Sequence, residues 1–183
     1  MAGLTPVPER QLQRLAWAFE GLCELLGGAV SWLSLLMVLT TFVVVVLRYA
    51  FDLGWIWLQE SVTYMHAALF LVGAAYTLKH QGHVRVDIFY SRFSPRTRAW
   101  VDLGGSLLLL LPVCLFIFIV SWDYVMQSWE LYEGSREAGG LDGDYLLKSL
   151  ILAMAGLLLL QGLAQAIRCL LELMGRDGGR VES

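Results

Sequence analysis

Four long apolar runs, separated by short polar segments, dominate the pattern along this chain. They cover residues 29–47, 61–78, 103–122 and 149–167. Each run is almost free of charged side chains and would be about 27–30 Å long as an α-helix, which matches the hydrocarbon core of a bilayer. The pattern therefore predicts an all-α integral membrane protein, with residues 1–183 forming one domain of four transmembrane helices.

The composition agrees with this prediction. Hydrophobic residues make up 57% of the chain and charged residues only 16%, whereas a soluble domain carries about 25% charge. The connections between the runs are too short for a separate soluble domain, so we expect a multi-pass membrane protein.

Basic residues concentrate on one side of this predicted arrangement. With four spans, the N-terminus, the second connection and the C-terminus share a side. Ten of the thirteen Lys and Arg residues fall there: Arg10, Arg14, Lys79, Arg85, Arg92, Arg96, Arg98, Arg168, Arg176 and Arg180. The positive-inside rule therefore predicts that both termini are cytoplasmic.

Residues 10–26 precede the first span and have an amphipathic pattern. The apolar positions are Leu12, Leu15, Ala16, Phe19, Leu22, Cys23 and Leu26, and the polar positions opposite are Gln13, Arg14, Glu20 and Glu24. A helix with one apolar face at the membrane boundary lies in the interface or packs on a partner. We predict a separate helix here, and interfacial membrane binding is the favoured interpretation.

Residues 83–98 combine aromatic and Arg side chains and are predicted to form an interfacial segment on the cytoplasmic side, in contact with membrane lipids. Ser94 and Pro95 are typical of an N-cap and a first helical position. The third helix would then run from Pro95 to near Tyr132 over roughly 55 Å, with a kink at Pro112.

Residues 133–144 are rich in Gly and acidic side chains and are predicted to form a loop on the outer side of the membrane, opposite the two termini. Gly134 is a candidate stop for the third helix, and Asp144 a candidate N-cap for the fourth.

Glu60 lies about one turn inside the outer boundary marked by Trp57. A carboxylate is costly there, and Arg48 is the nearest candidate partner across a short hairpin. We predict an Arg48–Glu60 ion pair that fixes the first two spans, in preference to a role in proton or ion handling.

His66 is the only histidine well inside a predicted span. We expect a hydrogen bond to a neighbouring helix, with a ligand or proton-relay role as the alternative. A bis-His haem site needs a second histidine inside the membrane, which the chain lacks.

Small and amide residues within the spans predict close helix packing. They are Gly73, Ala74, Ala75, Gly104, Gly105, Gly156, Gly162, Gln161 and Gln165. Small residues let helices approach closely, and amides inside a membrane bond across helices. Cys23, Cys114 and Cys169 lie in or beside apolar segments and predict no disulfide.

The sequence contains no phosphate-binding loop, dinucleotide fingerprint, nucleophile elbow or metalloprotease helix. We therefore predict no enzymatic activity, no cofactor or metal site, and no binding to nucleic acid. Four helices without a cluster of intramembrane carboxylates are more typical of a subunit in a larger assembly than of a complete pump.

Several motifs, in order, resemble the small membrane subunit of TRAP (tripartite ATP-independent periplasmic) transporters, the DctQ-like small permease. They are Arg48-Tyr49, Trp57 and Glu60, Gly73-Ala74-Ala75, Gly82-His83-Val84-Arg85-Val86-Asp87, and Leu160-Gln161-Gly162-Leu163. The resemblance covers about residues 29–170. It adds His83, Arg85 and Asp87 to the candidate structural or interface residues, beside Arg48, Trp57, Glu60, His66, Gly73, Gln161 and Gln165.

The resemblance implies a subunit of the bacterial inner membrane that works with a large multi-span permease and a periplasmic solute-binding protein. In such systems an organic acid such as a dicarboxylate enters with sodium ions, and the small subunit braces the scaffold of the large one. The 133–144 loop is then a candidate contact for the binding protein. Two alternatives remain open: a haem-anchor or redox membrane subunit, and a self-contained four-span carrier.

Overall fold

The computed structural model describes residues 7–83, 90 and 92–173 of the chain. The described elements are α1 (Val7–Phe51), α2 (Ile56–Lys79), α4 (Pro95–Gly105), the π-helical turn η1 (Ser106–Leu110), α5 (Leu111–Glu130) and α6 (Asp144–Leu173). All of the regular secondary structure in this part of the chain is helical. Four helices, with α4, η1 and α5 counted as one, are long and apolar enough to cross a membrane, which confirms the predicted fold class.

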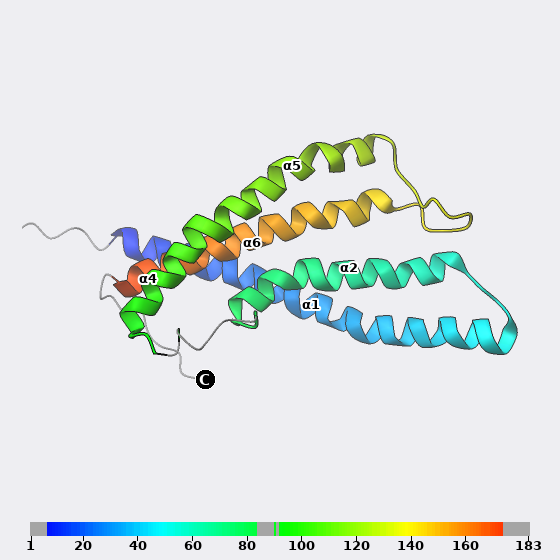
Figure 1. Cartoon of the computed structure of the whole chain (residues 1–183), viewed down its shortest axis with the longest axis horizontal. Coiled ribbons are helices and arrows are strands. Elements are labelled where there is room, and N and C mark those ends of the chain that lie inside the picture. Colours follow the sequence, from blue (N-terminus) through cyan, green and yellow to red (C-terminus); the bar gives the residue numbers. More distant parts are fainter. Residues whose placement is uncertain (1–6, 84–89, 91, 174–183) are drawn as a thin grey trace, which may run out of the picture.

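The helices form two hairpins, α1–α2 and α5–α6, which lie side by side with α2 next to α6 (Figure 1). The beginning of α1 and the end of α6 lie at the same end of the molecule, opposite the α5–α6 loop (Figure 1). The solvent-accessible surface is 12781 Å², whereas a compact soluble monomer of this mass exposes about 8,900 Å². Much of the apolar side-chain area of the spans therefore faces outward.

The sequence predicted a separate helix over residues 10–26, before the first span. The structure has no separate helix there, because α1 continues through this segment without a break. At 1.5 Å per residue α1 is about 68 Å long, roughly twice the thickness of a hydrocarbon core. Its buried residues are Ala16, Glu20, Cys23 and Gly27, at the spacing of one helix face. This face packs on α6 and α2 of the same chain, whereas Leu15 and Leu22 of the predicted apolar face are exposed.

The third span begins and ends close to the predicted positions. The Ser94 hydroxyl accepts the backbone N–H of Thr97 at 3.2 Å, which confirms the cap, and Pro95 is the first helical residue. The helix then continues to Glu130 through η1, which ends two residues before Pro112. Proline lacks an N–H and clashes with the preceding turn, and a π turn is one way in which a continuous helix accommodates such a defect.

The stop after α5 lies at Tyr132 rather than at the predicted Gly134. Tyr132 has φ +44°, and the N–H of Glu133 donates to the Ser128 carbonyl at 3.1 Å, as in a Schellman cap. Non-glycine residues seldom adopt this conformation, so sequence reasoning favours the glycine. Asp144 is the first residue of α6, and the carbonyl of Gly143 accepts the first helical N–H groups.

Close helix approach occurs at some of the predicted small residues and not at others. Ala75 is buried against Cys23 and Leu157 where α1, α2 and α6 meet. A Cβ atom on Gly162 would lie 2.7 Å from the end of the Leu110 side chain, so α6 packs closely against η1 at this glycine and a larger residue would force Leu110 to move. A Cβ atom on Gly156 would lie 3.9 Å from the Phe118 ring, in ordinary contact, and one on Gly73, Gly104 or Gly105 would meet nothing within 4 Å, so these three glycines make no close approach to another helix of the described chain.

Candidate functional site

Two polar networks hold the helices together, one at each end of the molecule, and both centre on Glu side chains. The outer network lies where the α5–α6 loop folds back onto the beginning of α2. The inner network lies where the beginning of α1, the end of α2 and the second half of α6 meet.

Glu60 is the centre of the outer network. One of its carboxylate oxygens accepts the hydroxyl of Ser135, and the other accepts the backbone N–H of Leu141 at 2.6 Å. A Cβ atom on Gly140 would clash first with the Ser135 side chain and would also lie 2.6 Å from Glu60 Oε2, so a side chain at position 140 would disrupt the contact between them. The loop is therefore fixed to α2 by an acidic side chain that it surrounds.

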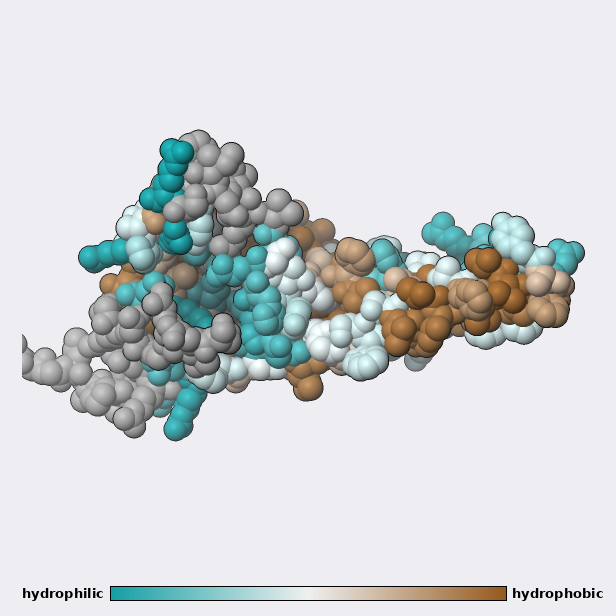
Figure 2. Space-filling view, turned by 90° about the horizontal axis from the view of Figure 1, so that it is seen from below, coloured by the Kyte–Doolittle hydropathy of each residue, from teal (hydrophilic) through white to brown (hydrophobic). Residues whose placement is uncertain are grey.

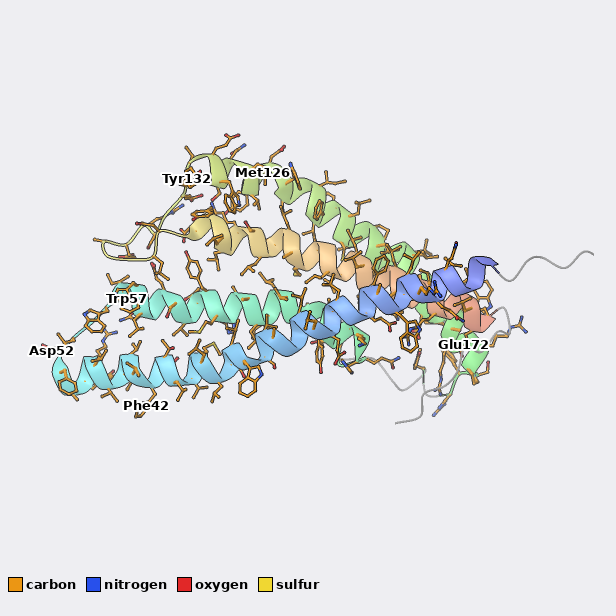
Figure 3. All side chains as sticks on the ribbon, turned by 180° about the vertical axis from the view of Figure 1, so that it is seen from behind. Phe42, Asp52, Trp57, Met126, Tyr132 and Glu172 are labelled. Carbon is orange, nitrogen blue, oxygen red and sulfur yellow. The ribbon has the colours of Figure 1, made fainter. Side chains whose placement is uncertain are left out.

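The predicted Arg48–Glu60 ion pair is not formed. Within the described ranges no ion pair includes Arg48, which is exposed at the end of α1. The physical reason is that the loop supplies Glu60 with a hydroxyl and a backbone N–H, so hydrogen bonds stabilise the charged carboxylate in place of a cation. Trp57, labelled in Figure 3, stacks on Trp55 with 6.0 Å between ring centroids.

The two ends of the loop are held by further contacts. Glu133 forms an ion pair with Lys148 and accepts the hydroxyl of Ser128 at 2.8 Å. These donors, the Lys148 ammonium first, hold the pKa of Glu133 below its usual range. One turn beyond Glu60 along α2, the hydroxyl of Tyr64 donates to Asp144 at 2.9 Å. The loop thus joins α2 to both helices of the second hairpin.

We expect Glu60→Ala to release the loop, because it removes the acceptor for both loop donors. Arg136, which is exposed in the loop, offers a cleavage site for trypsin. Loss of these two hydrogen bonds should increase the rate of cleavage at Arg136 about fivefold or more. Digestion of the detergent-purified protein, followed by mass spectrometry, measures this rate.

The control for this experiment is Arg48→Gln, which should leave the cleavage rate unchanged because Arg48 does not contact the loop. Gly140→Ala should act like Glu60→Ala, since it displaces the same carboxylate. Equal protection of the loop in wild type and Glu60→Ala would show that Glu60 does not hold it.

The stability of the loop should depend on pH through the protonation of Glu133. Its folded pKa is lower than its unfolded pKa, so its stabilising effect is complete above the unfolded value, about 4.3, and is lost as pH falls through the folded value. We expect the thermal midpoint, followed by Trp fluorescence, to fall between about pH 5 and pH 3 less in Glu133→Gln than in wild type. Glu130→Gln, an exposed neighbour, is the matched control; identical pH profiles for wild type and Glu133→Gln would contradict the assignment.

The inner network joins three helices. Glu20 of α1 is 6% exposed and forms an ion pair with Arg168 of α6. Glu24, one turn further along α1, is bound by Lys79 and lies 3.0 Å from the Nε2 atom of His80 at the end of α2. The face of the molecule in Figure 2 shows hydrophilic side chains toward this end and apolar ones along the opposite half.

The remaining predicted residues lie apart from these networks. His66 is exposed on α2 and contacts the Phe70 ring, with 4.5 Å between centroids, so the predicted hydrogen bond to a neighbouring helix is absent from the described chain.

Gln161 is buried, and its Oε1 atom has no hydrogen-bond partner among the described residues, while Gln165 is half-buried. His83 is exposed. Arg85 and Asp87, like most of the predicted 83–98 segment before Ser94, lie outside the described residues.

Sequence reasoning missed both acidic side chains of the inner network and the loop residues of the outer one. A signal existed for Glu20, because it follows Ala16 by four residues and precedes Cys23 by three, which places it on their face of the helix. No such signal identifies Ser135 or Leu141, since their contact with Glu60 depends on how a twelve-residue loop folds. Within the described residues no group of three or more His, Cys, Asp or Glu side chains could hold a metal ion.

Comparison with known families identifies the chain. Residues 37–172, which include all of the spanning part of α2, α5 and α6, match the family model described as tripartite ATP-independent periplasmic transporters, DctQ component. The chain belongs to the DctQ family. The resemblance drawn from its motifs is confirmed, and the protein is the small permease type of TRAP transporter subunit.

A DctQ-family relative agrees with this assignment. The C4-dicarboxylate TRAP transporter small permease protein DctQ of Vibrio cholerae serotype O1 is 32% identical over 88 residues. That alignment covers 48% of this chain and 38% of the relative, so the chain matches well under half of the length of that protein. No solved structure matches the chain.

Proposed function

We propose that this DctQ-family chain braces the scaffold of a large multi-span permease in a TRAP transporter that takes up an organic acid together with sodium ions. The transport site would lie in the large subunit. A periplasmic solute-binding protein would deliver the substrate, and the complex would lie in the bacterial inner membrane with both termini of this chain in the cytoplasm. The name of the Vibrio cholerae relative makes a C4-dicarboxylate the first substrate to test.

The observation that carries this proposal is that polar contacts join the helices at both ends of the molecule. Glu20 and Glu24 hold α1 to α6 and α2 at the inner end, and Glu60 holds the loop to α2 at the outer end. Helices joined at two levels resist sliding past one another. Such a unit suits a static support better than a moving domain.

The proposed contact with the binding protein rests on the α5–α6 loop. Arg136, Glu137 and Asp142 are exposed on it, while Glu60 and Glu133 hold its base in place. A fixed loop with exposed charges presents a defined surface to a partner. Replacing Glu137 and Asp142 by Ser should weaken binding-protein affinity for the complex; unchanged affinity would remove this part of the proposal.

The main test is purification of the tagged chain from its native membrane in mild detergent, followed by mass spectrometry. We expect a stoichiometric partner with more than ten predicted spans. Reconstituted in liposomes with the binding protein, the complex should accumulate radiolabelled succinate only when a sodium gradient is imposed, and the large subunit alone should be inactive or less heat-stable. Equal uptake by the large subunit without this chain would overturn the bracing role, and uptake independent of sodium would overturn the coupling.

A further inference from the structure

The outward face of α2 carries polar side chains at a depth where a lipid-facing helix is apolar. Thr63, His66 and Phe70 are exposed, and Gly73 continues the same face with open space around its Cα. Their spacing of three, four and three residues places them within about 80° of each other around the helix. We call these four residues the α2 stripe.

Two members of the α2 stripe have unsatisfied polar groups. Ser61 and Thr77, on the same helix, donate to carbonyls of α2 itself. By contrast, Thr63 and His66 have no hydrogen bond to any described residue, and the only ring that His66 contacts there is that of Phe70. This ring contact leaves the imidazole nitrogens available to an outside partner.

The depth of His66 makes this exposure costly. It lies about 9 Å along the helix from Glu60 and about 20 Å from Lys79, which places it inside the hydrocarbon core if α2 spans the bilayer. Lipid chains offer no hydrogen-bonding groups, so a histidine there is normally directed at protein or at a water-filled cavity. The α2 stripe therefore indicates a surface that another protein covers.

The position of α2 decides what can cover it. α2 is flanked by α1 on one side and α6 on the other, so the α2 stripe lies on a broad face of the molecule and not at its edge. A helix laid on this face can contact α2 along its length, and the open space at Gly73 lets it approach closely. The partner must itself span the membrane and present a hydrogen-bonding side chain opposite His66.

We propose that the α2 stripe is the surface by which this chain docks against a transmembrane helix of the large permease subunit, with His66 hydrogen-bonded to a polar side chain of that helix. This inference rests on the proposed function, because membership of a three-part transporter is what makes the occupant a larger, different membrane chain. A second copy of this chain is the competing occupant, and the test below separates the two.

Photo-crosslinking in native membranes tests the surface. Phe70 and Phe42 are replaced, one at a time, by the photoreactive analogue benzoylphenylalanine. Both are exposed to the same extent, 64% and 66%, but Phe42 lies on α1 and points away from α2 (Figure 3). Illumination should join position 70 to the large subunit at a yield at least severalfold above that at position 42.

The role of His66 is tested by two substitutions that differ in hydrogen bonding. His66→Leu should lower the amount of large subunit recovered with the tagged chain about threefold to tenfold, the effect expected of an interhelical hydrogen bond. His66→Gln keeps a donor and an acceptor and should restore most of the recovery. Membrane insertion of both variants should match wild type, because Leu is favoured in a span.

The outcomes are distinct. A crosslinked product of twice the mass of this chain would overturn the proposal in favour of a second copy, and a product with lipid alone, or equal recovery with His66→Leu, would also overturn it. If the wild-type chain fails to retain any large permease, the proposed function itself fails. If it retains the permease but position 70 does not crosslink to it, only the docking surface is wrong.

Discussion

Gly27→Ala is expected to lower the thermal midpoint of the detergent-purified protein by about 4–8 °C, equivalent to about 2 kcal/mol in a chain of this size. Gly27 lies where α1 crosses α2, and a Cβ atom there would be 2.4 Å from the Cβ atom and the ring of Tyr76. Because the Tyr76 Cβ is fixed to its backbone, rotation of the side chain cannot remove the clash. The two helices would have to separate, and scanning fluorimetry would report the loss.

The adjacent glycine provides the matched control. A Cβ atom on Gly28 would meet nothing within 4 Å, so Gly28→Ala should leave the midpoint unchanged or raise it slightly, since Ala favours helix by up to about 1 kcal/mol over Gly. The two variants differ by one position and by the same methyl group. Similar midpoints for both would mean that α1 and α2 do not approach closely at Gly27.

Arg168→Leu should destabilise the protein by about 2–3 kcal/mol, which is at or below the lower limit of about 3 kcal/mol for breaking a fully buried ion pair, because Arg168 itself is half-exposed. Glu20 is 6% exposed, and without the guanidinium its buried carboxylate would lose its ion-pair partner and keep only the more distant charge of Lys79. The expected result is a lower thermal midpoint and a weaker hold of α1 on α6. Hydrogen exchange of the amides from Ala16 to Cys23 would locate the effect.

The double variant Glu20→Leu with Arg168→Leu should recover much of the lost stability, because it removes the uncompensated charge as well as its partner. Arg14→Leu is the control, since Arg14 is exposed on the same helix and takes part in no ion pair within the described ranges. If the double variant is as unstable as the sum of its single changes, Glu20 and Arg168 do not act as a pair.

Local signals in the sequence predicted the ends of helices well where a residue type has a single structural role there, such as capping. Ser94 followed by Pro95 predicted the beginning of the third span, and the structure confirms it. The same reasoning failed after α5, because Tyr132 adopts a conformation that usually needs glycine. It also treated residues 10–26 as an interfacial helix apart from the first span because of their amphipathic pattern, whereas α1 continues through them and their buried face packs on α6 and α2.

The partners of the candidate residues could not be predicted in the same way. Glu60 was correctly expected to need compensation, but the choice of Arg48 assumed that the nearest cation in sequence is the nearest group in space. The loop residues Ser135 and Leu141, more than seventy positions away, supply the compensation instead. The hydropathy pattern identifies which polar side chains in a span need a hydrogen-bonding or charged partner. It carries no information about which residues become those partners.

The sequence by itself determined that the chain has four spans, where the third begins, and to which family it belongs, because hydrophobic length, caps and ordered motifs are properties of neighbouring residues. Only the tertiary structure decided which face of each helix is covered. A helix turns by 100° per residue, so a small rotation or a change in crossing point exchanges buried and exposed positions. For that reason the exposure of His66 had to be read from the packed molecule.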